Sequence, residues 1–162
     1  MQRFVRFADR LTIACAIVAS VLLVVAVFVI TWMIFYRAIG HSAYWEIEFS
    51  VYSMVAAVFL GSPYCVKTNG HVAVDLLTEF TPQRANRVIG LVLALVSLAV
   101  CLYLTFAGGE LAYHAWLKGE TTESLWRPAK WPLYATMPVG LGITALQYVA
   151  EILRERPDRE AP

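Results

Sequence analysis

Residues 11–36 read LTIACAIVASVLLVVAVFVITWMIFY and contain no charged side chain. At about 1.5 Å per residue, a helix of this length exceeds the roughly 30 Å hydrocarbon core of a bilayer. Arginines precede the stretch, as they do in a secretory signal. Its uncharged part is much longer than the roughly 7 to 15 residues of a signal-peptide core, and no good small-residue cleavage site follows. The stretch therefore predicts a transmembrane helix that is retained.

Three further stretches also lack charged residues, namely 49–66, 88–109 and 131–150. Each is close to the roughly 20 residues that cross a bilayer. The composition agrees, because 59% of the 162 residues are hydrophobic and 15% are charged, against roughly 25% charged residues in soluble domains. The sequence predicts an all-α integral membrane protein with four transmembrane helices in one membrane domain, 1–162.

The distribution of Lys and Arg predicts the orientation. Nine of the 13 lie in the N-terminal segment, in the loop 67–87 or in the C-terminal tail, and the other four lie in the loops 37–48 and 110–130. The positive-inside rule therefore places both termini and the loop 67–87 in the cytoplasm. The predicted outer ends of the spans carry aromatic residues, which are typical of an interfacial belt and leave a docking surface as the alternative: Tyr44, Trp45, Trp116, Trp126 and Trp131.

The loop after the second stretch has an amphipathic pattern. Its apolar residues recur at i, i+3, i+4 and i+7, which predicts a short interfacial helix over 71–80. His71 and Asp75 are one turn apart on the polar face, and Glu79 follows at the same spacing. Because one helix seldom completes a metal site, we expect a solvated face and no bound metal.

Residues that carry catalytic chemistry are sparse. Glu46 and Glu48 are two positions apart, so on a helix they point to different faces and cannot form an acid/base pair. We interpret them as anchors at the membrane boundary. The three cysteines form no C-x-x-C pair, and the three histidines lie outside the uncharged stretches, so neither a redox centre nor a membrane haem is expected. A net charge of +1 without a clustered basic face gives no reason to expect a nucleic-acid partner.

Small residues inside the stretches favour close helix packing, as at Gly140 and Thr144 or Gly90 and Ala94. Pro138 is expected to bend or interrupt the fourth helix early. Near the outer end of the third span, Glu110 would become a helical neighbour of His114 only if that helix continued to about residue 116. We expect both to be outer-interface residues rather than a buried functional pair.

Four segments occur in a fixed order along the chain. They are Trp45-Glu46-x-Glu48, Phe59-Leu60-Gly61, Lys67-x-x-Gly70-His71-Val72-x-Val74-Asp75 and Trp131-Pro132-x-Tyr134-x-x-x-Pro138-x-Gly140. This succession resembles the small membrane subunit, DctQ-like, of the tripartite ATP-independent periplasmic (TRAP) transporters, over nearly the whole chain. The Gly-His-Val-x-Val-Asp segment is the most specific part. The chain departs from the family pattern after Glu48, where Ser50, Val51 and Tyr52 stand near a position that is often basic.

The resemblance implies a non-enzymatic scaffold of the bacterial inner membrane without a cofactor. It would bind a large multi-span membrane subunit that carries the substrate and sodium sites, while a periplasmic solute-binding protein delivers a small organic anion. Residues of the outer loops would help to dock the binding protein: Trp45, Glu46, Glu120, Glu123 and Trp126. Gly61 would permit close helix contact, and His71 with Asp75 would hold the surface helix against the partner.

Two other classes remain open. A self-contained oligomeric transporter or channel would require Glu48 or Glu110 to reach a water-filled path. A membrane enzyme or its anchor subunit would require a nucleophile with a base, or cofactor ligands, and the sequence shows neither arrangement.

Overall fold

The computed structural model describes residues 2–42, 44–68 and 83–154. It contains the helices α1 (Gln2–Ala38), α2 (Glu46–Lys67), α4 (Gln83–Lys118) and α5 (Trp131–Arg154). All four are long and apolar enough to cross a membrane, which confirms the predicted all-α architecture with four spans. The predicted interfacial helix over 71–80, with His71 and Asp75, lies outside the described residues.

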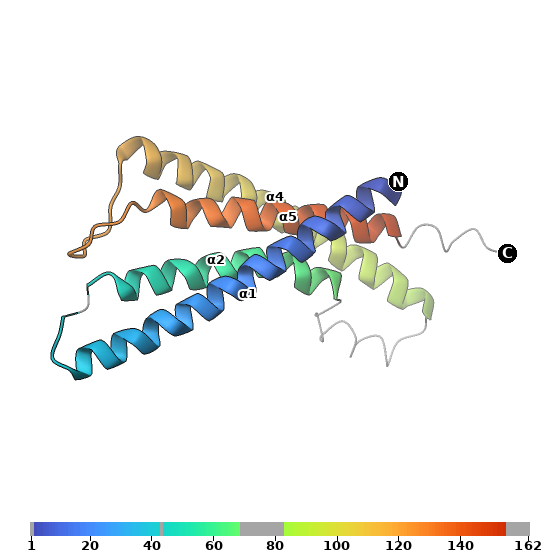
Figure 1. Ribbon diagram of the computed structural model, residues 1–162. Coiled ribbons are helices and arrows are strands. Elements are labelled where there is room, and N and C mark those ends of the chain that lie inside the picture. Colours follow the sequence, from blue (N-terminus) through green and yellow to red (C-terminus); the bar gives the residue numbers. More distant parts are fainter. Residues whose placement is uncertain (1, 43, 69–82, 155–162) are drawn as a thin grey trace.

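The helices are packed in the order α1, α2, α5, α4. Helix α2 packs between α1 and α5, and α4 packs along α5. Near the N-terminus α1 also crosses α5, whereas at the opposite end the α1–α2 pair and the α4–α5 pair diverge (Figure 1). We call the end at which α1 begins and α5 finishes the terminal end, and the end formed by the connections 39–45 and 119–130 the loop end.

The helices are longer than the uncharged stretches that predicted them. Helix α1 begins at Gln2, and α4 continues past residue 109 to Lys118. A charged residue limits the part of a helix that can lie in hydrocarbon. The backbone hydrogen bonds of the helix nevertheless continue beyond that residue into the membrane–water interface. Helix α4 ends at Lys118, and the next residue, Gly119, caps it with a φ of 61° and an N–H that donates to Trp116 O at 3.1 Å. The continuation of α4 places Glu110 and His114 one turn apart.

Both prolines inside the helices are accommodated without a break. Pro63 lies within α2 and Pro138 lies within α5, and each helix continues on both sides. Helix α5 is therefore not interrupted at Pro138, and the bend that the sequence also allowed stays a prediction. A Cβ on Gly108 of α4 would lie only 3.3 Å from Pro138 Cδ, so the glycine leaves room for the proline ring at this helix contact.

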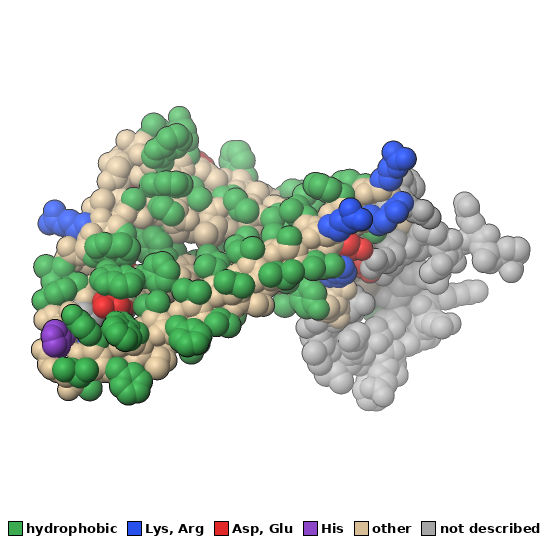
Figure 2. All heavy atoms as spheres, in the orientation of Figure 1, with side chains coloured by type: hydrophobic (Ala, Val, Ile, Leu, Met, Phe, Trp, Pro, Cys, Tyr) green, Lys and Arg blue, Asp and Glu red, His purple; other side chains and the backbone are tan. Residues whose placement is uncertain are grey.

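Small side chains fill much of the interior, and large apolar ones face outward. Alanines are prominent among the buried hydrophobic residues, at positions 8, 19, 26, 57, 115, 145 and 150. By contrast, Phe28 is 71% exposed and Phe106 is 75% exposed. Figure 2 shows hydrophobic side chains spread over the visible face of the molecule. Small residues let helices approach closely in lipid, where outward apolar groups carry no penalty.

Candidate functional site

A hydrogen-bonded network joins three helices at the terminal end. Thr12 Oγ1 of α1 donates to Gln147 Oε1 of α5 at 3.0 Å, and Gln147 Nε2 donates to Asp9 Oδ1 at 3.2 Å. Lys67 Nζ of α2 lies 3.6 Å from the same Asp9 oxygen. Thr12 is 0% exposed and Gln147 is 1% exposed. Because buried polar groups in hydrocarbon need internal partners, this terminal-end network (Asp9, Thr12, Lys67, Gln147) fixes α1 against α2 and α5.

The α2–α5 seam, formed by Phe59, Ser62, Gly140 and Thr144, is a close helix contact. A Cβ on Gly140 would collide with the carbonyl group of Phe59 and lie 2.8 Å from Phe59 Cβ. One turn later, the hydroxyls of Thr144 and Ser62 are hydrogen-bonded at 2.6 Å. The Gly140–Thr144 spacing therefore serves close packing, whereas a Cβ on Gly90 would meet no described atom within 4 Å.

The connection 119–130 folds as a short hairpin at the loop end. Thr121 and Ala129 form an antiparallel bridge, and Lys130 N donates to Glu120 O at 2.9 Å. The Tyr52 hydroxyl of α2 donates to Ala129 O at 3.0 Å. A hairpin that would otherwise be tied only to α4 and α5 is thus also attached to α2.

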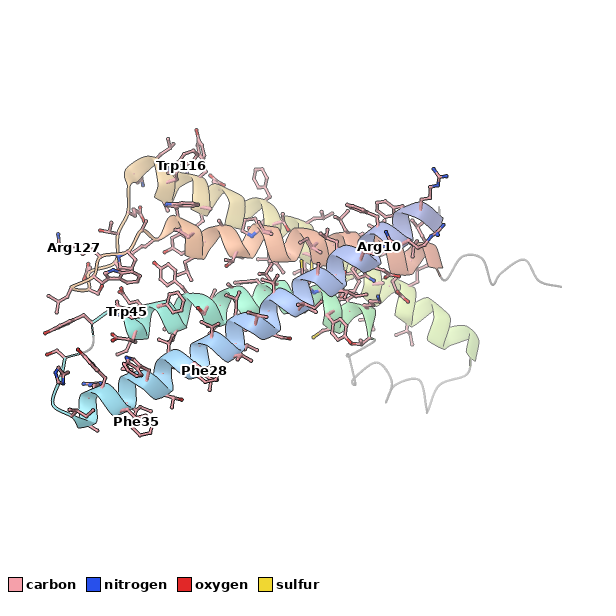
Figure 3. The ribbon with its side chains drawn as sticks, viewed as in Figure 1. Arg10, Phe28, Phe35, Trp45, Trp116 and Arg127 are labelled. Carbon is pink, nitrogen blue, oxygen red and sulfur yellow. The ribbon has the colours of Figure 1, made fainter. Side chains whose placement is uncertain are left out.

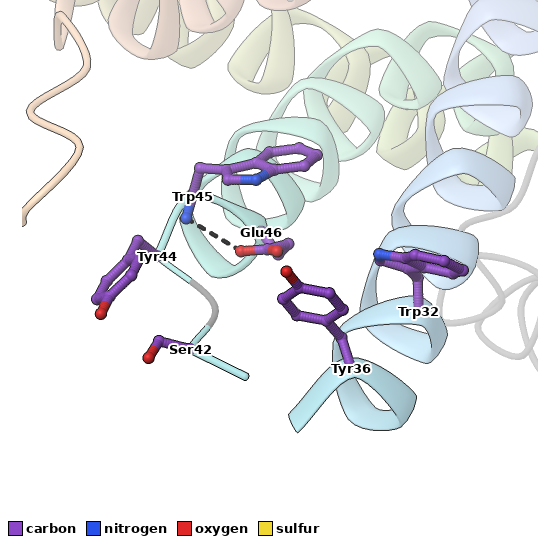
Figure 4. Close-up of a pocket in the computed structure, with 6 residues that line it drawn as sticks. All are labelled: Trp32, Tyr36, Ser42, Tyr44, Trp45 and Glu46. Atoms are coloured by element: carbon purple, nitrogen blue, oxygen red, sulfur yellow. Dashed lines mark hydrogen bonds between the residues drawn. The ribbon is translucent and has the colours of Figure 1, made fainter. Parts of the chain in front are cut away.

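Aromatic rings connect the two loops of this end. Trp45 before α2 and Trp126 on the hairpin meet edge to face, with ring centroids 6.4 Å apart. These rings lie at the loop end, opposite the terminal end, as the positions of Trp45 and Arg10 show (Figure 3). A pocket of about 400 Å³ opens beside Trp45, between α1 and α2 (Figure 4). Its lining consists of Trp32, Tyr36, Ser42, Tyr44, Trp45 and Glu46.

The two acids at the start of α2 are drawn inward. Glu46 is 4% exposed, and its Oε2 accepts a hydrogen bond from Trp45 N at 3.1 Å. Glu48 Oε2 is buried and has no hydrogen-bond partner among the described residues. Carboxylates are favoured in the first turn of a helix by its dipole. The two carboxylates are therefore buried or half-buried among the described residues, and their role as anchors at the membrane boundary stays a prediction.

The other predicted residues occupy different surfaces. Glu123 is exposed and Trp126 is 48% exposed on the hairpin, where Glu120 is half-buried. Gly61 faces α1, since a Cβ there would lie 3.9 Å from Ala19 Cβ. The partner-contact roles of these residues stay predictions.

Glu110 and His114 form an exposed pair on α4. Glu110 Oε1 lies 3.8 Å from His114 Nε2, and their side chains are 62% and 54% exposed. The pair is not buried within the chain. Across the described ranges 2–42, 44–68 and 83–154, no group of three or more His, Cys, Asp or Glu residues could hold a metal ion.

Sequence reasoning missed Thr12, Gln147, Trp32 and Tyr36. The search for charges inside the spans passed over neutral polar side chains. A hydroxyl or carboxamide inside an apolar stretch is itself a signal, because it must find a partner in the bilayer. The pocket residues carried no such signal, since interfacial aromatic rings are common.

Comparison with known proteins places this architecture in a family. Residues 26–157 match the family described as tripartite ATP-independent periplasmic transporters, DctQ component. The C4-dicarboxylate TRAP transporter small permease protein DctQ of Pseudomonas aeruginosa is 30% identical over 98 residues, which are 59% of this chain and 46% of that relative. The chain thus spans about half the length of this curated relative. No solved structure matches the chain. Since the family match runs from the first span to beyond the last, the chain belongs to the DctQ component family of TRAP transporters, a non-enzymatic family of multi-pass membrane proteins.

Proposed function

We propose that this chain is the small permease subunit of an ion-gradient-driven uptake transporter for a small organic anion, with a C4-dicarboxylate as the first candidate and sodium as the expected coupling ion. Its partners would be a large multi-span membrane subunit and a periplasmic solute-binding protein. The family match over residues 26–157 is the observation that carries this proposal. The name of the Pseudomonas relative supports the substrate class.

The distribution of charge supports a scaffold rather than a conducting path. The middle parts of the four described helices, 11–36, 49–66, 89–109 and 131–150, contain no charged residue. Transporters commonly place ionisable groups near the bilayer midplane to bind substrates and ions. In the proposed complex, the large subunit would supply those groups.

The two ends support an orientation with the termini in the cytoplasm. The terminal end carries basic residues such as Arg10 and Lys67, and the loop end carries Trp45 and Trp126. Under the positive-inside rule, the hairpin 119–130 would face the periplasm of a bacterial inner membrane. Its exposed Glu123 and Trp126 would then be available to the solute-binding protein.

Deletion and complementation test the assignment. A strain that lacks this chain is expected to lose uptake of a labelled C4-dicarboxylate, and the tagged chain is expected to restore uptake and to co-purify with a near-equimolar large membrane subunit. Collapse of the sodium gradient should abolish the restored uptake. Unchanged uptake in the deletion strain, or transport by this chain alone in liposomes, would contradict the proposal, and the second result would favour a self-contained transporter.

Charge reversal on the hairpin tests the docking surface. The double variant Glu120→Lys/Glu123→Lys should reduce uptake severalfold while membrane insertion stays normal, because complementary charge contributes to encounter between proteins. The matched control is Glu110→Lys, which reverses an exposed acid on α4 rather than on the hairpin. Equal uptake by the double variant and the unmodified chain would remove the hairpin from the docking surface.

A further inference from the structure

The pocket between α1 and α2 has no role in the function described so far. It has a volume of about 400 Å³ and lies at the loop end, between the last turns of α1 and the start of α2. Four aromatic residues line it, together with Ser42 and the carboxylate of Glu46: Trp32, Tyr36, Tyr44 and Trp45. The pocket therefore combines aromatic faces with one acid.

The acid lacks a counter-charge in the described chain. Glu46 is 4% exposed, and among the described residues its carboxylate accepts one hydrogen bond, from Trp45 N, and forms no ion pair. The helix N-terminus offsets only part of the cost of burying a charge. A cation in the pocket would neutralise the carboxylate and use its remaining acceptor sites.

The rings favour the same kind of ligand. Trp32 and Tyr36 are stacked with centroids 6.3 Å apart and form one wall of the pocket. In Figure 4 the Tyr36 hydroxyl points toward the Glu46 carboxylate, and Trp45 lies on the other side of that carboxylate. Aromatic faces attract cations, and a carboxylate accepts hydrogen bonds from an ammonium group. A compact ammonium group matches both features, whereas an anion matches neither.

The position of the pocket identifies the source of that ammonium group. Trp32 is 63% exposed, and the same face of α1 continues toward the middle of the span through Phe28 and Val21, which are 71% and 56% exposed. Phe28 projects from α1 on the side away from α2 (Figure 3). An apolar track that starts at the exposed Trp32, on the rim of the pocket, and runs along the outer surface of α1 suits an acyl chain whose headgroup occupies the pocket.

We propose that this pocket binds the headgroup of phosphatidylethanolamine. Its primary ammonium donates to the Glu46 carboxylate, the rings of Trp32, Tyr36 and Trp45 surround it, and an acyl chain lies along Phe28 and Val21. The assignment requires only that the chain spans a membrane, so it does not depend on the solute or on the orientation of the termini.

Native mass spectrometry of the full-length chain in detergent tests the site. The chain is titrated with phosphatidylethanolamine and with phosphatidylglycerol of the same acyl composition. We expect phosphatidylethanolamine to bind about tenfold more tightly, as a charge-assisted contact with cation–π support would produce. Equal binding of the two lipids by the unmodified chain would overturn the proposal, and this comparison needs no variant.

Two variants and a matched control localise the effect. Glu46→Gln should abolish the preference for phosphatidylethanolamine, and Trp32→Leu, which keeps the apolar contact but removes the aromatic face, should reduce it about threefold. Glu48→Gln makes the same change at an acid outside the pocket lining and should keep the full preference. A preference that survives Glu46→Gln would overturn the proposal.

A further outcome would assign the pocket to another cation. If Glu46→Gln leaves lipid binding unchanged but reduces co-purification of the large subunit, a basic side chain of that subunit occupies the pocket and the lipid assignment fails. Because the titration uses this chain alone, a failed transport assay leaves its result unaffected.

Discussion

At the terminal end, buried Thr12 and Gln147 hydrogen-bond to each other across α1 and α5, whereas at the loop end Glu46 and Glu48 turn inward without a basic partner among the described residues. The first pair uses its polar atoms within the chain. The second pair has acceptor atoms without a hydrogen-bond partner among the described residues, such as Glu48 Oε2. In a low-dielectric environment an internally satisfied polar group fixes helices together, and an unsatisfied one indicates a missing partner.

The two ends also differ in how the helix pairs are joined. The terminal-end network connects α1, α2 and α5 through side chains. At the loop end, the Tyr52 hydroxyl bonds to Ala129 O, and the rings of Trp45 and Trp126 touch. We infer that the terminal end is the more rigid one, and that the loop end is better suited to adjust when it meets a partner. Four substitutions test this difference.

The largest loss of stability is expected at the α2–α5 seam. This seam lies between the two ends, and the packing of both ends depends on it. Gly140→Leu would force a side chain into the backbone of Phe59, which cannot move aside as a flexible side chain would. Overpacking of this kind lowers the free energy of unfolding by about 3 kcal/mol or more. Thermal unfolding in detergent, followed by circular dichroism, measures the change.

The matched control for the seam is Gly90→Leu. Among the residues that the structure describes, a Cβ on Gly90 would meet no atom within 4 Å, so this variant should retain nearly full stability. Equal melting temperatures for the two variants would mean that close packing at the seam does not stabilise the fold.

The next effect is expected in the terminal-end network. Gln147→Leu leaves Thr12 without its interhelical acceptor and should lower the free energy of unfolding by about 1 to 2 kcal/mol. A double-mutant cycle with Thr12→Val should give a coupling of about 0.6 to 1.7 kcal/mol, the range found for hydrogen bonds between membrane helices. Thr31→Val removes an exposed hydroxyl that bonds within its own helix and is the control. Zero coupling would show that the terminal end is not held by this contact.

A smaller effect is expected from the ion pair of the same end. Lys67→Met removes the cation 3.6 Å from Asp9 Oδ1, while Gln147 continues to donate to that oxygen. Because the two side chains are 21% and 19% exposed, the free energy of unfolding should fall by at most about 1 kcal/mol. Chemical unfolding at low and high salt measures the loss, which should shrink as salt screens the pair. A loss that is independent of salt would point to packing of the lysine stem instead.

The smallest effect is expected from the exposed Glu110–His114 contact on the loop-end part of α4. Glu110 and His114 are 62% and 54% exposed, so Glu110→Gln should change the free energy of unfolding of the isolated chain by less than about 0.5 kcal/mol. The same unfolding series provides the measurement. If Glu110→Gln lowered the free energy of unfolding as much as Lys67→Met does, the terminal end would not be the more strongly stabilised of the two ends.

The four spans and the all-α class could be predicted because hydrocarbon excludes charge. Long uncharged stretches such as 11–36 therefore identify the spans directly. The helix ends could not be predicted in the same way. Helix α4 continues to Lys118 past Glu110, since a charged residue at the interface does not interrupt backbone hydrogen bonding. Pro138 was expected to bend or interrupt α5, and the helix continues through it. The close contact of its ring with Gly108 of α4 depends on two segments distant in sequence and could not be predicted from either one.

By itself the sequence predicted four helices long and apolar enough to cross a membrane. Four segments in a fixed order, of which Gly70-His71-Val72-x-Val74-Asp75 is the most specific, indicated the TRAP small-subunit family. Only the tertiary structure decided which polar groups are satisfied within the chain. Thr12 and Gln147 are 135 positions apart and meet because α1 crosses α5, whereas Glu46 is enclosed by rings from α1 and remains without a cation among the described residues. The exclusion of charge from hydrocarbon is a property of each segment and can be read locally, but the partner of a buried polar atom depends on how the helices pack.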